Sequence, residues 1–132
     1  MNYPVVNIPP GKQVIWGAFC QCAWDKTVEI VDPNGRTIAT GYKKFDGVDL
    51  QQLRLKDGSW LFNSGNGGDF TVKIMSGQGT PSFAMAQDTI YKYEQREPHY
   101  GTTVSICTED DVNIDKDYND CTVLLSWTNK QG

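Results

Sequence analysis

Long apolar runs are missing from this 132-residue sequence. No run approaches the roughly 20 consecutive apolar residues that a helix needs to span a bilayer, so we expect no membrane insertion. Basic residues are also few, because 12 Lys and Arg stand against 16 Asp and Glu, which gives a net charge of −4. Non-specific binding of nucleic acid relies on clustered Lys and Arg, so the composition argues against a nucleic-acid partner.

Histidine is almost absent, since His99 is the only one in the chain. It has no obvious catalytic partner in the sequence, and a single histidine of this kind usually belongs to a surface loop. Asp88, Glu94 and Glu97 are acidic, but the paired carboxylates of a glycoside hydrolase are recognised by the distance between them. The sequence therefore gives no support to catalysis, and we expect a protein that is not an enzyme.

The N-terminus lacks the basic start, long apolar core and small-residue cleavage site of a secretory leader. We therefore expect a cytoplasmic protein or one secreted without a leader. The four cysteines, Cys20, Cys22, Cys107 and Cys121, do not have the spacing of paired C-x-x-C zinc knuckles. They allow three disulfide pairings or four thiols, and the sequence alone does not choose among these arrangements.

Long helices are not expected, because 13 glycines and 6 prolines punctuate a chain that also contains 4 Trp and 6 Tyr. Glycine and proline favour turns, whereas aromatic residues favour pleated sheets. Apolar or alternating segments between these turns predict strands at 14–19, 27–31, 36–40, 50–55, 59–62, 70–75, 83–93, 102–107 and 122–127. We predict a single domain over residues 1–132, an all-β antiparallel sandwich of about nine strands.

For some of these segments the sequence also predicts which strands form a hairpin, or whether the segment is a strand or a helix. A turn signal from Asp32 to Gly35 separates two alternating segments, so the strands around it are predicted to form a hairpin. The segments at 50–55 and 59–62 repeat this pattern. Residues 83–97 contain enough helix formers to suggest a helix, but their alternation has a period of two, which favours a strand.

The negative charge is concentrated in one short segment. Six acidic residues and one lysine lie between Glu109 and Asp120, a net charge of −5, while the rest of the chain sums to +1. Carboxylates this close resist ionisation unless solvent or a cation neutralises them. The segment has no His or Cys, and its oxygen donors suit Ca²⁺, which takes about six to eight oxygen ligands, better than zinc or iron.

An EF-hand and a merely solvated loop are the two simpler readings of this segment. Asp115, Asp117 and Asn119 fit the first, third and fifth positions of an EF-hand, but Asp120 stands where Gly is needed and Ser126 where a bidentate Glu is needed. A solvated loop is the usual explanation of a charge run. The three oxygen-bearing side chains at alternate positions, however, can converge on one side of the backbone.

Two segments together form a recognisable pattern. The first is Asp115-Lys116-Asp117-Tyr118-Asn119-Asp120, preceded by Glu109-Asp110 and followed by an apolar strand that ends in Trp127. The second and weaker one is Asn7-Ile8-Pro9 with the apolar run 14–19 and the polar turn after it. They resemble the calcium-mediated fucose/mannose-binding lectins of bacteria, the family typified by the second soluble lectin of Pseudomonas.

The resemblance implies a β-sandwich with a calcium-binding loop near the C-terminus, in which two adjacent Ca²⁺ ions per subunit are ligated by hydroxyls of a mannose- or fucose-type sugar. The implied metal ligands are Gln21, Glu109, Asp111, Asp115, Asp117, Asn119 and Asp120. The implied sugar contacts are Cys22, Ala23, Asp110, Asp115, Asp117, Asp120 and Gly132. Asp117 and Asp120 bridge both ions in this arrangement, Asn119 supplies an amide oxygen, and Asp110 accepts a sugar hydroxyl.

The tryptophans divide into two groups. Trp24 lies beside the early loop, which is the polar turn formed by Gln21, Cys22 and Ala23 after the apolar run 14–19. It is added to the sugar-binding candidates. Trp16, Trp60 and Trp127 occupy strand positions and are expected in the core.

The sequence departs from the family pattern in three places. Two extra residues lie between Asp110 and Asp115, so Asp111 and Glu109 compete for one ligand role. The tail after the last tryptophan is also two residues longer than the family's. In the early loop, Gln21 stands for an Asn ligand, and Cys22 with Ala23 stand for small hydroxyl residues that touch sugar, so the sugar preference should differ.

The family also places the C-terminal carboxylate of a neighbouring subunit at the calcium, and avidity makes weak single-site binding useful. We therefore expect a homo-oligomer, a dimer or a tetramer. Two alternatives remain open. One is a calcium-stabilised structural or adhesion sandwich that binds no sugar, and the other is a C2-like sandwich that binds anionic phospholipid through calcium. The latter is disfavoured because its acids usually come from separate loops.

Overall fold

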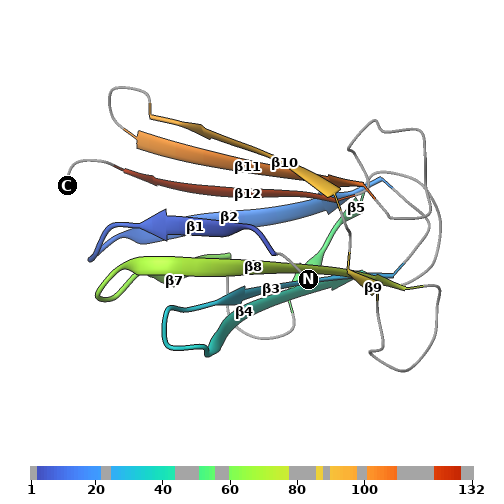
Figure 1. Cartoon of the computed structure of the whole chain (residues 1–132), viewed down its shortest axis with the longest axis horizontal. Coiled ribbons are helices and arrows are strands. Elements are labelled where there is room, and N and C mark those ends of the chain that lie inside the picture. Colours follow the sequence, from blue (N-terminus) through green and yellow to red (C-terminus); the bar gives the residue numbers. More distant parts are fainter. Residues whose placement is uncertain are drawn as a thin grey trace.

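The computed structural model describes residues 3–21, 25–43, 51–55, 60–77, 86–87, 90–97, 101–109 and 121–128. Its strands are β1 Val5–Ile8, β2 Gln13–Cys20, β3 Asp25–Val31, β4 Thr37–Lys43, β5 Gln51–Gln52, β6 Arg54–Leu55, β7 Leu61–Asn63, β8 Gly68–Gly77, β9 Ala86–Gln87, β10 Ile90–Arg96, β11 Gly101–Glu109 and β12 Cys121–Thr128 (Figure 1). Within these ranges no helix is long and apolar enough to cross a membrane.

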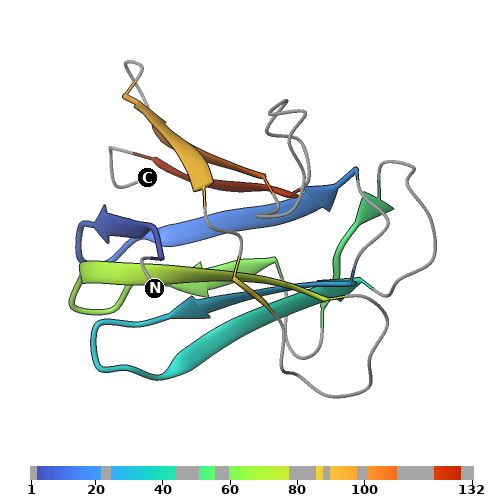
Figure 2. The same cartoon turned by 45° about the vertical axis from the view of Figure 1, so that its right-hand side comes forward.

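The strands form two six-stranded antiparallel sheets that lie face to face (Figures 1 and 2). The first sheet has the order β1-β8-β3-β4-β6, with β9 paired to β8. The second has the order β10-β11-β12-β2-β5, with β7 paired to β2. Nine of the strands have three or more residues, and β5, β6 and β9 have two each. The prediction of an all-β antiparallel sandwich of about nine strands is confirmed.

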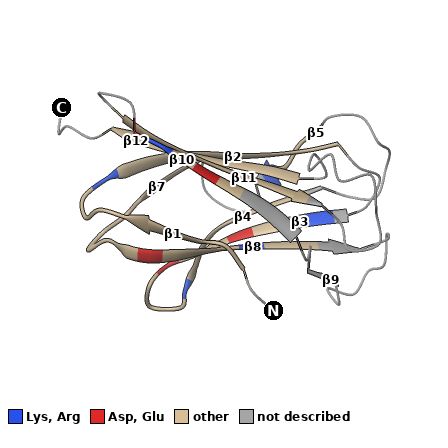
Figure 3. Cartoon of the chain, turned by 45° about the horizontal axis from the view of Figure 1, so that its top comes forward, with Lys and Arg blue, Asp and Glu red and all other residues tan. Residues whose placement is uncertain are grey.

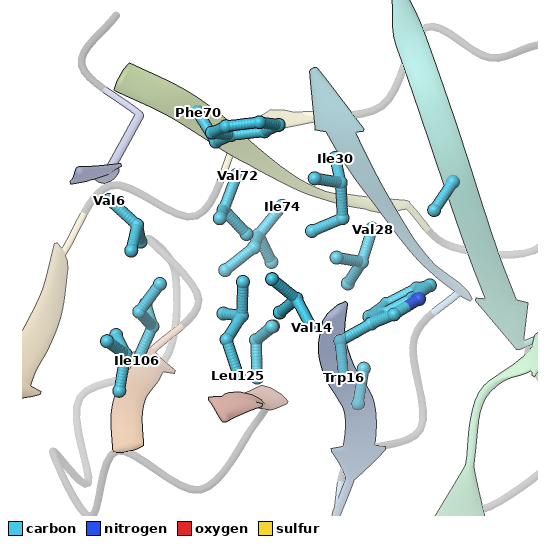
Figure 4. Close-up of a cluster of buried hydrophobic side chains, with 14 of the residues drawn as sticks. Val6, Val14, Trp16, Val28, Ile30, Phe70, Val72, Ile74, Ile106 and Leu125 are labelled. Carbon is cyan, nitrogen blue, oxygen red and sulfur yellow. The ribbon is translucent and has the colours of Figure 1, made fainter. Parts of the chain in front are cut away.

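The core lies between the two sheets because each strand alternates between an apolar inner face and a mixed outer face. In β12, Val123, Leu125 and Trp127 are buried, whereas Leu124 and Thr128 are exposed. Figure 4 shows side chains of the first sheet meeting those of the second, among them Val28, Ile30, Val72 and Ile74 against Val14, Trp16, Ile106 and Leu125. The period of two in the sequence thus becomes a continuous apolar layer.

Three tryptophans belong to this layer, as predicted. Trp16 and Trp127 are 2% and 4% exposed. Trp60 is partly buried and packs against Trp16 in an edge-to-face arrangement, with 4.6 Å between the ring centroids.

The predicted hairpin around Asp32 is confirmed by the pairing of β3 with β4. The Gly35 N–H donates to the Asp32 carbonyl at 2.9 Å, which closes the turn. The Asp32 carboxylate accepts the backbone N–H groups of Asn34 and Arg36 at 3.0 and 2.9 Å. Gly35 has a φ of +84°, which glycine adopts without a steric penalty.

The second predicted hairpin is wrong. The predicted strand at 50–55 is divided between the sheets, because β5 pairs with β2 and β6 pairs with β4. In addition, β7 pairs with β2, not with β6. The reason lies at Leu53, which is 1% exposed and separates β5 from β6. Its burial between the layers carries the chain from one sheet to the other.

The strand interpretation of the segment after residue 83 is confirmed where the structure describes it. β9 pairs with β8, and β10 pairs with β11 along its whole length. The strands predicted at 14–19, 70–75, 102–107 and 122–127 correspond to β2, β8, β11 and β12.

Two turns are joined by one buried hydroxyl at the end of the sandwich where β1 leads into β2. Ser64 is 4% exposed. Its hydroxyl donates to the Pro9 carbonyl at 2.6 Å and accepts the Lys12 backbone N–H at 2.8 Å. The turn between β1 and β2 is therefore held against the turn between β7 and β8.

Gly67 lies in the second of these turns, where the two backbones approach closely. Its φ is +73°, and a Cβ added there would lie 2.7 Å from the Pro10 nitrogen and 2.8 Å from the Ile8 carbonyl oxygen. Both are backbone atoms, so a side chain at this position requires the turns to separate.

We expect Gly67→Ala to lower the free energy of unfolding by about 3 kcal/mol, because a left-handed φ and a backbone overlap both oppose the methyl group. Gly35→Ala is the matched control, because Gly35 also has a positive φ but an added Cβ meets nothing within 4 Å. It should cost only about 1 kcal/mol, the penalty of the left-handed φ alone. Urea unfolding measures both, and equal losses would contradict the importance of the close approach.

Candidate functional site

Most of the predicted metal- and sugar-binding residues lie outside the residues that the structure describes. These are Cys22, Ala23, Trp24, Asp110, Asp111, Asp115, Asp117, Asn119, Asp120 and Gly132. Glu109 is the last residue of β11, and its side chain is also outside the described part. Gln21 directly follows β2 and is exposed. The structure therefore bears on the site through the strands that hold these segments.

The end of β11, the start of β12 and the end of β2 lie side by side in the second sheet, where the acidic segment and the early loop are attached. Cys121, the first residue of β12, is the register partner of Thr108 in β11 and of Cys20 in β2. Glu109 follows the first of these partners, and Gln21 follows the second. The acidic segment and the early loop are therefore attached on the two sides of one residue, at the right-hand end of β2 and β11 in Figure 1.

The first residue of β12 is fixed by a buried side chain as well as by the sheet. Thr108 is 2% exposed, and its hydroxyl donates to the Cys121 carbonyl at 2.9 Å. A threonine is suited to this position because its β-branched side chain favours a strand while its hydroxyl satisfies a buried acceptor. The two ends of the acidic segment are thus held at a defined separation.

The row of strand ends extends to both neighbours. Ile90 of β10 is the partner of Glu109 on one side. Gln51 of β5 is the partner of Cys20 on the other. The acidic segment therefore leaves from the interior of a sheet, not from its edge, and a strand backbone hydrogen-bonded on both sides is a rigid support for binding residues.

Sequence reasoning missed a buried lysine at this end of the molecule. Lys26, the second residue of β3, is fully buried and shares the inward face of the strand with Val28 and Ile30. The signal was present, because the alternation of the strand extends two residues before Val28. Elsewhere, the described acidic and basic residues are spread along the strands and turns (Figure 3), with Arg36 paired to Asp32 and Arg96 paired to Glu94. Lys26 thus places a buried amino group at the end where the segment of net charge −5 is attached.

One residue of the second sheet, Tyr93, has a pKa displaced from its ordinary value, and it lies away from the strand ends. Burial raises the pKa of the Tyr93 phenol, in the middle of β10. Its hydroxyl donates to the Gln95 side chain at 2.6 Å. The phenol is therefore neutral at pH 7 and adds no charge to the site.

The described strands and turns do not themselves form a metal site. In that part of the chain no group of three or more His, Cys, Asp or Glu side chains is placed to hold a metal ion. Cys20, Cys107 and Cys121 are in the thiol form. The oxygen donors that suit calcium belong to the 109–120 segment and to Gln21, so the calcium prediction depends on the acidic segment that the strand ends support.

Comparison with known proteins identifies the family. The model of the family described as "Fucose-binding lectin II (PA-IIL)" matches residues 6–129. A search of curated proteins finds no match. The C-terminal domain of the BC2L-C lectin from Burkholderia cenocepacia is 26% identical, with a TM-score of 0.71 over 99% of this chain and 98% of that one.

Two further solved structures share the fold over the full length of both chains. The Chromobacterium violaceum lectin CV2L, solved in complex with alpha-methyl-fucoside, is 22% identical with a TM-score of 0.70 and covers 100% of each chain. The high-affinity mannose-binding lectin of Ralstonia solanacearum is 22% identical with a TM-score of 0.69, again over 100% of each chain.

The predicted class of protein is confirmed by these matches. A lectin binds carbohydrate without transforming it, which agrees with the expectation of a protein that is not an enzyme. Calcium binding is a property of this lectin family. Two independent lines, a strand framework that matches known lectins and a family match over nearly the whole chain, lead to one conclusion: the chain belongs to the fucose-binding lectin II (PA-IIL) family of carbohydrate-binding proteins.

Proposed function

We propose that this lectin binds its sugar through two calcium ions held by the 109–120 segment together with Gln21. One observation carries the proposal. Gln21 and Glu109 directly follow the two register partners of Cys121, so the early loop and the acidic segment start from the two strands that flank β12. A shared ion needs donors from both segments, and the strand order supports their meeting.

The donor set suits calcium in type and in number. Asp117 and Asp120 are proposed to bridge the two ions, and Asn119 to supply an amide oxygen. Asp115 and Glu109 complete the second ion, with Asp111 as the competing ligand for the Glu109 role. Two divalent cations offset the repulsion among these carboxylates, which otherwise opposes their ionisation.

The sugar is proposed to complete the coordination of the ions. A sugar hydroxyl competes poorly with water for a single protein hydrogen bond, but a divalent ion that lacks a ligand binds it more strongly. Carboxylates next to the ions, Asp110 among them, accept the hydroxyl protons in charge-assisted hydrogen bonds. Mannose- and fucose-type monosaccharides have neighbouring hydroxyls that can reach both ions.

The early loop is proposed to set the sugar preference. Cys22 and Ala23 stand where the family resemblance implies small hydroxyl residues, and neither replaces a hydroxyl contact to sugar. Trp24 adds an aromatic surface in the same loop. We therefore infer a ranking of sugars that differs from the fucose or mannose preference of hydroxyl-bearing relatives.

Assembly is proposed as a homo-oligomer, a dimer or a tetramer. In the resemblance, the C-terminal carboxylate of a neighbouring subunit reaches the calcium, and Gly132 is the corresponding residue here. Several sites on one assembly raise the avidity for a glycan surface above the affinity of one site.

We expect Asp117→Ala and Asp120→Ala each to weaken calcium binding by on the order of 100-fold or more, because either change removes a ligand shared by both ions. Isothermal titration with calcium measures the loss. Asp69→Ala is the control, because Asp69 is an exposed acid of β8 that bonds Asn7. Calcium affinity unchanged in either site variant would refute the two-ion arrangement.

We expect the heat of binding of mannose or fucose to appear only after calcium has been added and to disappear with a chelator. The physical reason is that the ions themselves are the proposed sugar ligands. The measurement is calorimetry with mannose, fucose and galactose, each with and without chelator. Sugar binding that survives the chelator contradicts the proposal, and calcium heat without any sugar heat identifies a structural calcium site instead.

We expect the double variant Cys22→Ser with Ala23→Ser to change the ratio of the fucose and mannose affinities by about 5- to 10-fold, the worth of one added hydrogen bond. The calcium affinity should stay the same, because neither position is a proposed metal ligand. An unchanged sugar ratio would show that the early loop does not face the sugar.

A further inference from the structure

Two buried cysteines face each other at the strand ends that support the site. Cys20, the last residue of β2, and Cys121, the first residue of β12, are register partners in neighbouring antiparallel strands. Both are fully buried. Side chains of directly opposed residues point to the same face of a sheet, so both sulfur atoms lie on the inner face.

The backbone hydrogen bonds show which kind of antiparallel pair this is. The Trp16 N–H donates to the Trp60 carbonyl at 3.0 Å, and the Ala18 carbonyl accepts the Leu53 N–H at 2.9 Å. Even-numbered residues of β2 therefore direct their backbone groups away from β12. Since these directions alternate along a strand, the backbone groups of Cys20 also point away from β12.

The other strand leads to the same result independently. The Cys121 carbonyl accepts the Thr108 hydroxyl and is therefore directed toward β11, away from β2. Cys20 and Cys121 thus form a non-hydrogen-bonded pair, the kind in which opposed residues are closest, with about 4.5 Å between their Cα atoms. That separation is within the range of about 4.4 to 6.8 Å that a disulfide requires.

The third described cysteine is excluded from this pairing. Cys107 of β11 is the partner of Thr122, whose hydroxyl lies 3.9 Å from its sulfur. One step along an antiparallel pair reverses the face, so Cys107 lies on the outer side of the sheet and Cys121 on the inner side. The sheet separates its sulfur atom from the buried pair.

We propose that Cys20 and Cys121 are a disulfide-forming pair, which closes when the chain folds in the presence of a small-molecule disulfide such as oxidised glutathione. The two S–H bonds break and one bond forms between the two Sγ atoms. The S–S bond of the oxidant breaks, and its two sulfur atoms leave as thiols that take up the two hydrogens and the two electrons. In the thiol state, which the structure shows, the pair packs as two small apolar side chains.

The cross-link joins the strand before the early loop to the strand after the acidic segment. Gln21 follows one linked cysteine in the sequence and Asp120 precedes the other, so the cross-link fixes the two points where the early loop and the acidic segment are attached. It also closes a loop of the chain that spans most of the protein. This inference does not depend on the calcium proposal, because the cross-link is defined by strand pairing alone.

The test is oxidative refolding. The full chain is unfolded with a thiol reductant, refolded in a glutathione redox buffer without calcium or sugar, alkylated, and digested with trypsin. We expect a linked pair of peptides, residues 13–26 joined to residues 117–130, with Cys107 alkylated in the peptide 97–116. The midpoint of thermal unfolding should rise by on the order of 10 °C over the reduced protein, because a long loop is closed.

Variants assign the sulfur atoms. The peptide 13–26 contains both Cys20 and Cys22, so Cys22→Ser must retain the link, whereas Cys20→Ser and Cys121→Ser must lose it. Cys107→Ser is the matched control and must retain it. Any of three results overturns the proposal: four alkylated cysteines after oxidative refolding, a link to the peptide 97–116, or loss of the link in Cys22→Ser. The wild-type peptide map, which needs no variant, decides by itself whether the peptides 13–26 and 117–130 are linked.

Discussion

The insertion of β12 between β11 and β2 is the constraint on which the rest of the molecule depends. The backbone N–H and C=O groups of β12 are thereby hydrogen-bonded to a strand on each side, and Val123, Leu125 and Trp127 are added to the core. It also places the ends of β11 and β2 beside the first residue of β12. The same pairing thus produces the sandwich, the support for the acidic segment and the juxtaposition of Cys20 with Cys121.

Much of the fold could be predicted because the second sheet and the β3–β4 hairpin follow a period of two and are bounded by clear turn residues. Prediction failed at residues 50–62, where the alternation was correct and the pairing was not. Strand pairing is not a local property, and β5 and β6 are two-residue strands on either side of a single buried leucine, Leu53. A local pattern cannot show that one residue marks the passage between two sheets.

The candidate site was predictable in its chemistry but not in its support. A run of acids and amides between Glu109 and Asp120 indicates a hard cation by residue type alone. That the early loop starts beside it depends on the pairing of β2 with β12, two strands at opposite ends of the chain. Lys26 and the cysteine pair were missed for related reasons. To predict the burial of Lys26, the alternation of β3 has to be followed back to the start of the strand. To predict the cysteine pair, the register between β2 and β12, which are distant in sequence, has to be known.

The central place of the C-terminal strand has a consequence for biosynthesis. As this domain leaves the ribosome, β2 emerges early and β12 after all the other described strands, so the second sheet lacks an interior strand until β12 has been made. Until then β2 and β11 each present an open edge, the kind of surface that promotes association of nascent chains. Contacts this distant in sequence also form slowly. The support for the acidic segment is therefore completed only when β12 is inserted, and chaperones have the greatest opportunity to act in the interval before that insertion.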